Sequence, residues 1–104
     1  MRISVQTIPD CPNAIGAVSL VLEQVQELGL DNVVVTERVI SSSAEASVLD
    51  FHGSPSFVIN GVDPFATPET PVAFACREYD HTGTKSGLPD AAVLRAAIAE
   101  AAAR

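Results

Sequence analysis

Two cysteines are the residues of this sequence whose side chains could carry covalent chemistry, and the first lies between two expected elements. Cys11 stands in the run Asp10-Cys11-Pro12-Asn13, behind a strand-like segment and ahead of a helix. The positive end of the helix dipole and the unpaired N–H groups of the first turn favour thiolate over thiol there, and the thiolate is the nucleophile. We therefore expect a reactive thiol at Cys11. The alternative is a small buried thiol that fills a gap between the strand and the helix.

The run Gly53-Ser54-Pro55 at the entry of an apolar strand is the second motif. An X-Pro bond has a tertiary amide, which makes the cis form accessible, and a strand entry after glycine is a place for it. We expect a cis bond between Ser54 and Pro55. A trans proline that begins an edge strand is the alternative.

The elements that position these motifs follow from the spacing of apolar residues and from proline and glycine. Strands are predicted over residues 2–7, 33–40, 56–60 and 73–79, and helices over 12–28, 44–49 (a weak turn) and from Pro89 to the end. Gly29 is the expected stop of the first helix, and Asp31, Asp50 and Asp90 are expected turn or cap residues.

This order, β-α-β-α-β-β-α, predicts one α/β domain over residues 1–104. The first two strands flank a helix and should be parallel, while the last two should form an antiparallel pair. We expect a four-stranded mixed sheet with helices on both faces.

The element order, Cys11 at the start of the first helix and the run from Gly53 to Gly61 (GSPSFVING) resemble the thioredoxin-like superfamily, and small bacterial glutaredoxin-like proteins in particular. The resemblance covers nearly the whole chain. It implies a thioredoxin-like fold with Cys11 as the catalytic thiol. It also implies a cis-proline at Pro55 that faces this thiol, and a substrate that pairs with the backbone of Ser54.

One departure from that family decides the expected chemistry. In the family motif Cys-x-x-Cys a second cysteine breaks the mixed disulfide, but here Cys11-Pro12-Asn13-Ala14 ends in alanine. The resemblance therefore implies a monothiol thiol–disulfide oxidoreductase. Either Cys11 works alone, with a low-molecular-weight thiol as co-substrate, or Cys76 resolves the mixed disulfide.

The expected direction of segment 73–79 argues against Cys76 in that role. An antiparallel return would place Tyr79, Asp80 and His81 nearest to Cys11, with Cys76 about 10 to 13 Å further along the strand. A disulfide needs Cα atoms within ~7 Å. We expect Cys76 to be a buried structural residue, and its pairing with Cys11 is the alternative.

Composition excludes several classes of protein. Thirteen Asp and Glu residues against six Lys and Arg give a net charge of -7, which disfavours nucleic acid and anionic membrane surfaces as partners. Two cysteines are too few for a disulfide scaffold, and no apolar run approaches a membrane span. The run from Ala14 to Leu22 lacks the flanks of a secretory signal. A cytoplasmic protein without a metal or an organic cofactor is expected.

Two rival hypotheses remain beside the enzyme, whose substrate would be a protein or small-molecule disulfide. One is a non-catalytic binding or dimerising module, compatible with a homodimer. The other is capture of a soft metal or an organomercurial by Cys11, alone or with Cys76. His81 is expected near the thiol, where it could tune Cys11, or else as a solvated loop residue. His52 and His81 have no spacing typical of a zinc site. Asp63-Pro64-Phe65 and Tyr79 are expected to form a hydrophobic rim.

Overall fold

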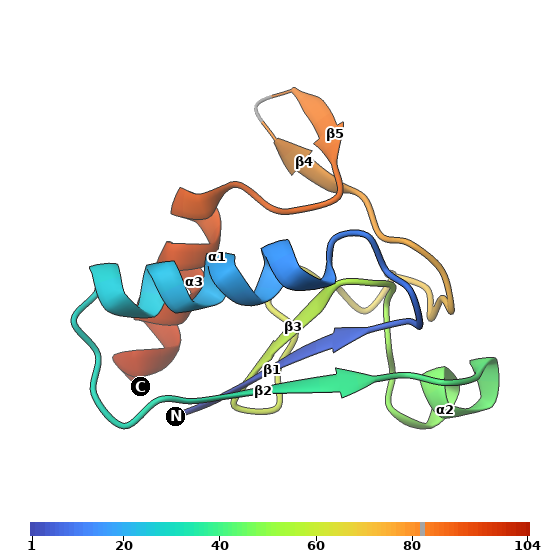
Figure 1. The fold of residues 1–104 in the computed structure, drawn as a ribbon, viewed down its shortest axis with the longest axis horizontal. Helices are drawn as coiled ribbons and strands as arrows, with labels where there is room; N and C mark the ends of the chain where they lie inside the picture. Colours follow the sequence, from blue (N-terminus) through green and yellow to red (C-terminus); the bar gives the residue numbers. More distant parts are fainter. Residues whose placement is uncertain (82) are drawn as a thin grey trace.

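The computed structural model describes residues 1–81 and 83–104, which form five strands and three helices (Figure 1). In chain order these are β1 (Arg2–Thr7), α1 (Ala14–Glu27), β2 (Val34–Val39), α2 (Ser43–Val48), β3 (Ser56–Ile59), β4 (Tyr79–His81), β5 (Thr84–Ser86) and α3 (Ala91–Ala102). The α/β class is confirmed, and the first three expected strands lie within a residue or so of the observed bounds.

Three strands form the central sheet, in the order β2-β1-β3. β1 and β2 are parallel, as expected for strands that flank a helix, and β3 is antiparallel to β1. The alternation of β1 sends Ile3 and Val5 to one face, where both are fully buried, and Ser4 and Gln6 to the other. The sheet therefore has one apolar and one polar face.

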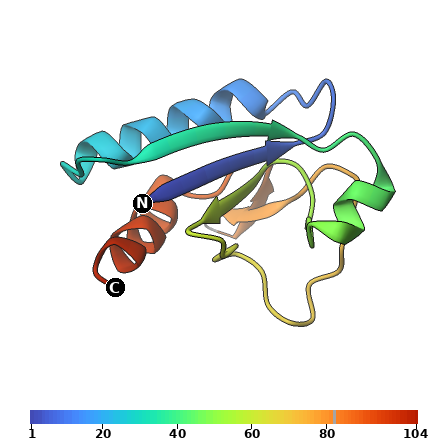
Figure 2. The same cartoon turned by 90° about the horizontal axis from the view of Figure 1, so that it is seen from below.

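Helices α1 and α3 pack against the apolar face. Ala17 and Val21 of α1 and Leu94 and Ile98 of α3 join the buried strand residues in one hydrophobic cluster. The short helix α2 lies beyond the C-terminal end of β2 (Figures 1 and 2). The polar face, which includes the exposed Arg2, is left without a covering helix from the described part of the chain.

Two helix boundaries follow from local chemistry that the sequence predicts. Beyond the end of α1, Gly29 takes a φ of +63°, a left-handed conformation that costs glycine no steric strain. The N–H of Leu30 donates to the C=O of Val25 (3.3 Å) and completes this cap. At the start of α3 the carboxylate of Asp90 accepts from the N–H of Ala92 (2.8 Å).

The expected thioredoxin-like architecture, a four-stranded mixed sheet with helices on both faces, is wrong. The central sheet has three strands, and β4 pairs with β5 in a separate two-stranded sheet. Figure 1 shows this hairpin projecting away from the central sheet. Residues 80–87, expected as a loop, supply β5 and part of β4.

Segment 73–79 is the source of this difference. The N–H of Ser54 donates to the C=O of Ala75 (2.8 Å), and the N–H of Arg77 donates to the C=O of Ser54 (2.9 Å). These bonds form an isolated parallel bridge between Ser54 and Cys76. The segment therefore runs in the same direction as residues 53–55, whereas an antiparallel return from β3 was expected. The long connection after β3 carries the chain back along the sheet before this segment begins (Figure 2).

Candidate thiol site

Two consecutive turns lead from β1 to α1, and Cys11 lies where they meet. The N–H of Cys11 donates to the C=O of Ile8 (3.3 Å), with a proline and Asp10 in the middle of the turn. Asp10 takes a φ of +60°, as the third residue of a type II turn must. The N–H of Ala14 donates to the C=O of Cys11 (3.2 Å) and closes the second turn. The expected helix start at Pro12 is wrong, because α1 begins at Ala14.

Ser54 connects this double turn to β3. The register of β1 and β3 pairs Gln6 with Ser56 and so sets Ile8 opposite Ser54, two residues further on. There the hydroxyl of Ser54 accepts a hydrogen bond from the N–H of Ile8 (3.1 Å). Ser54 is buried, and the Ser54–Pro55 bond is cis, as expected. Ser54 thus lies beside the turn that carries Cys11.

Cys76 lies on the other side of Ser54, through the parallel bridge. It is exposed, Cys11 is partly exposed, and both are free thiols. A buried Cys76, far down an antiparallel strand, was therefore the wrong expectation. The parallel direction of its segment brings it to the end of the sheet where Cys11 lies.

The backbone groups of Ser54 that were expected to bind substrate have partners within the chain. The N–H bonds to Ala75 and the C=O accepts from Arg77. A substrate strand that paired with Ser54 would have to displace residues 75–77. Substrate binding by Ser54 and Pro55 stays a prediction under this condition.

An ion pair that sequence reasoning missed fixes the segment next to Cys76. The guanidinium of Arg77 donates to Asp63 (2.7 and 3.5 Å) and to the hydroxyl of Ser56 (3.1 Å). The side chains of Arg77 and Asp63 are only 8% and 10% exposed. The carboxylate of Asp63 also accepts from the N–H of Phe65 (2.9 Å). An arginine within the apolar run 73–79 was the available signal, because a buried guanidinium needs an acidic partner.

Tyr79 packs beneath this ion pair. Its ring makes edge contacts with Phe57 and Phe65, and the guanidinium of Arg77 lies 4.9 Å from its centre. Its hydroxyl donates to the C=O of Pro55. Burial, opposed in part by the nearby Arg77, raises the pKa of Tyr79 above its ordinary range. Tyr79 and Phe65 therefore pack with the hydrophobic core, where a hydrophobic rim was expected.

Gly53 is required by the close approach of the segment that carries Cys76. Its φ is +112°, a conformation that residues with a side chain rarely adopt. A Cβ on Gly53 would lie 2.9 Å from the Cβ of Arg77. The glycine thus allows Arg77 and its neighbour Cys76 to lie against Ser54.

We call the surface formed by residues 8–13, 49–54 and 71–77 the thiol end. Hydrogen bonds join the last two stretches, from the N–H of Ala73 to the C=O of Phe51 (3.0 Å) and between His52 Nδ1 and the C=O of Pro71 (3.1 Å). The thiol end and the residues flanking it carry the exposed apolar side chains of Ile15, Val72 and Phe74. They also carry the exposed acidic residues Asp10, Asp50 and Glu78. The only arginine or lysine within the stretches that define the thiol end, Arg77, is neutralised by Asp63.

The two histidines contact different aspartates. His52 Nε2 lies 3.5 Å from Asp50, and His81 Nε2 lies 3.8 Å from Asp90 at the start of α3. No group of three or more potential metal ligands occurs in residues 1–81 and 83–104. The idea that His81 tunes Cys11 stays untested.

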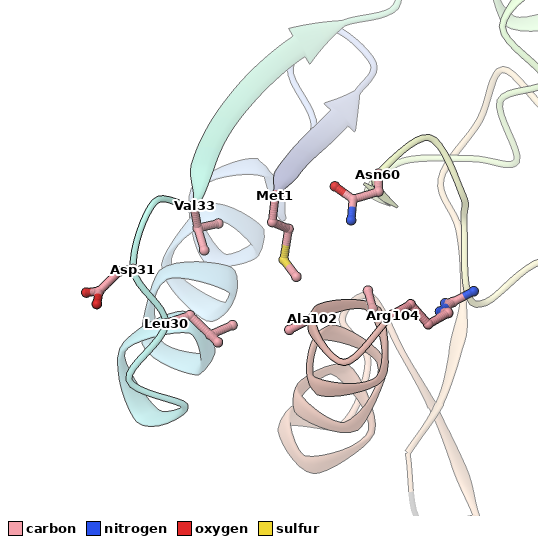
Figure 3. Close-up of a pocket in the computed structure, with 8 residues that line it drawn as sticks. Met1, Leu30, Asp31, Val33, Asn60, Ala102 and Arg104 are labelled. Carbon is pink, nitrogen blue, oxygen red and sulfur yellow. The ribbon is translucent and has the colours of Figure 1, made fainter.

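A pocket of about 320 Å³ lies at the opposite end of the sheet (Figure 3). Met1, Leu30 and Val33 line it together with Asn60 and Arg104. Met1 precedes β1 and Cys11 follows it, so the length of β1 separates this pocket from the thiol end. The pocket is therefore no part of the thiol site.

Comparisons of the chain with protein-family models, with curated proteins and with solved structures find no match. In the described part of the chain no helix has both the length and the apolar character to cross a bilayer. Function must therefore be argued from the geometry of the thiol end.

Proposed function

We propose that the chain is a thiol–disulfide oxidoreductase in which Cys11 is the nucleophile. The observation that carries the proposal is the hydrogen bond from the N–H of Ile8 to the hydroxyl of Ser54, which holds the Cys11 turn beside Ser54 and Pro55. Cys11 is a free and partly exposed cysteine, as a reactive thiol is expected to be. The thiol stands in the double turn that leads from β1 into α1, two residues before the N-cap Asn13.

The reaction is thiol–disulfide exchange. The Cys11 thiolate attacks one sulfur of a disulfide RSSR, the S–S bond breaks, and RS⁻ leaves and takes up a proton. Cys11 then carries the other half of the substrate as a mixed disulfide. The proposal includes a reducing compartment, such as the cytoplasm, and kinship with the thioredoxin-like superfamily. It does not include the four-stranded sheet.

The test measures adduct formation on a single thiol. The variant Cys76→Ser leaves Cys11 as the one cysteine, and intact mass follows its reaction with 2-hydroxyethyl disulfide. We expect one adduct, reversed by a reductant, to form faster in the folded chain than in the same chain unfolded in urea. Cys11→Ser is the control for modification elsewhere. An adduct rate no greater than that of the unfolded chain contradicts the proposal and favours a non-catalytic binding module.

A second experiment tests the turn that holds Cys11. The bond from the N–H of Ala14 to the C=O of Cys11 closes a turn, which brings their Cα atoms within ~7 Å and so within reach of a disulfide. The variant Ala14→Cys, made together with Cys76→Ser, should form this disulfide under mild oxidation and should reduce insulin faster than Cys76→Ser alone. Absence of the disulfide would show that the turn is not closed in solution.

A further inference from the structure

Three chain segments lie side by side at the thiol end, with Ser54 in the middle. On one side the hydroxyl of Ser54 accepts from the N–H of Ile8, and a turn leads from Ile8 back to Cys11. On the other side the backbone of Ser54 forms the parallel bridge with Cys76. Bridged backbones lie about 4.8 Å apart, so Cys76 lies at about that spacing from Ser54. We infer that Cys76 is the second thiol of the reaction at Cys11; this inference rests on the function proposed above.

The segment around Cys76 is fixed at both ends and exposed between them. The N–H of Ala73 bonds to the C=O of Phe51, and Arg77 is held by Asp63. Residues 74–76 between these two points are exposed. Because the side chains of an extended segment alternate, Cys76 faces away from the side on which Arg77 is buried. The thiol is thus kept near Ser54 and remains open to solvent.

Closure of a disulfide requires this exposed stretch to move toward the turn that carries Cys11. The first turn holds the Cα of Cys11 within ~7 Å of that of Ile8, and a disulfide needs a similar separation between Cys11 and Cys76. Residues 74–76 can move toward the turn once the hydrogen bond from Ser54 to Ala75 opens, while Arg77 remains anchored to Asp63. Oxidation should therefore expose the amide of Ser54 to hydrogen exchange.

In the second step of the reaction, Cys76 resolves the mixed disulfide that Cys11 formed in the first. The Cys76 thiolate attacks the sulfur of Cys11 in the mixed disulfide, the bond from Cys11 to the substrate sulfur breaks, and the second RS⁻ leaves and takes up a proton. A bond between Cys11 and Cys76 replaces it. The chain loses two electrons and two protons, which the disulfide RSSR gains as it becomes two molecules of RSH.

The experiment compares the native chain with Cys76→Ser, using 2-hydroxyethyl disulfide as the probe and intact mass as the readout. We expect the native chain to end as a species lighter by two hydrogens, with no adduct retained, and Cys76→Ser to retain one adduct on Cys11. Peptide mapping without reductant should find the bond between Cys11 and Cys76. A native chain that keeps its adduct as long as Cys76→Ser does would overturn the inference and leave the monothiol reaction standing. If neither chain forms an adduct, the proposed function fails.

A matched variant tests whether the second thiol must stand at residue 76 or whether any thiol on this segment suffices. Ala75→Cys combined with Cys76→Ser moves the thiol by one residue, to the other side of the extended segment, and both positions are exposed. We expect this variant to lose its adduct more slowly than the native chain. Equal rates would overturn the role assigned to Cys76. Hydrogen exchange at the Ser54 amide, faster in the oxidised native chain than in the reduced one, is the conformational readout.

Discussion

Replacement of Asp63 by alanine should destabilise the chain by about 3–5 kcal/mol, because it leaves a buried guanidinium without its acidic partner. The pair is bidentate, with N–O distances of 2.7 and 3.5 Å, and both side chains are at least nine-tenths buried. Arg77 would keep only the hydroxyl of Ser56 and the ring of Tyr79, neither of which carries a compensating charge. A chain of this size has a total stability of about 5–15 kcal/mol, so the loss is a large fraction of it.

Urea unfolding followed by circular dichroism measures this effect. Asp80→Ala is the control, because it breaks an ion pair with Lys85 whose side chains are 84% and 62% exposed, and it should change the stability little. The double variant Asp63→Leu with Arg77→Met should recover much of the loss, since it removes both charges together. If Asp63→Ala is no less stable than Asp80→Ala, the ion pair does not anchor segment 73–79, and the account of how Cys76 is positioned is wrong.

Three further outcomes are expected. Because the pKa of Tyr79 is raised, the folded chain retains the phenol proton more tightly than the unfolded chain, and the contribution to stability should be full below pH ~10 and fall as the pH rises above it. Tyr79→Phe should remove this part of the fall. Phenolate absorbance reports on Tyr79 alone, because the chain has one tyrosine. Gly53→Ala should destabilise the chain more than Gly61→Ala, since both have positive φ but only the first would place a Cβ against Arg77, and urea midpoints decide the order. Oxidised glutathione, an anion, should react with Cys11 more slowly than neutral 2-hydroxyethyl disulfide and should gain rate with added salt, because the thiol end is acidic; equal rates and no salt effect would argue against that electrostatic account.

The features that the sequence predicted correctly depend on short-range patterns. The alternation of residues 2–7 is enough to define β1 and its buried face, because a pleated strand has a period of two. Helical spacing and Gly29 define the end of α1 in the same way. The parallel pairing of β1 and β2 then follows, since a crossover helix joins them. The cis form of Ser54–Pro55 was a local feature too.

The direction of segment 73–79 could not be predicted in this way. Its β-like composition favours a strand but does not say along which edge, or in which sense, the strand will lie. The deciding contact joins Arg77 to Asp63, fourteen residues earlier, and is a long-range pairing without any periodic signal. The wrong direction of this segment also made the predicted position of Cys76 wrong. A parallel segment places Cys76 beside Ser54, whereas an antiparallel one would have placed it far away. Gly53, which must lack a Cβ for Arg77 to approach, is the residue that could have indicated the close contact.

The placement of the two chain ends has a practical consequence. Met1 and Arg104 line the same pocket, at the end of the sheet opposite to the thiol end (Figure 3). A fusion partner, an affinity tag or a surface tether attached at either residue would therefore project away from Cys11 and Cys76. A Cys76→Ser chain immobilised through either end should present Cys11 outward, so that partners captured as mixed disulfides can be eluted by reductant without interference from the support.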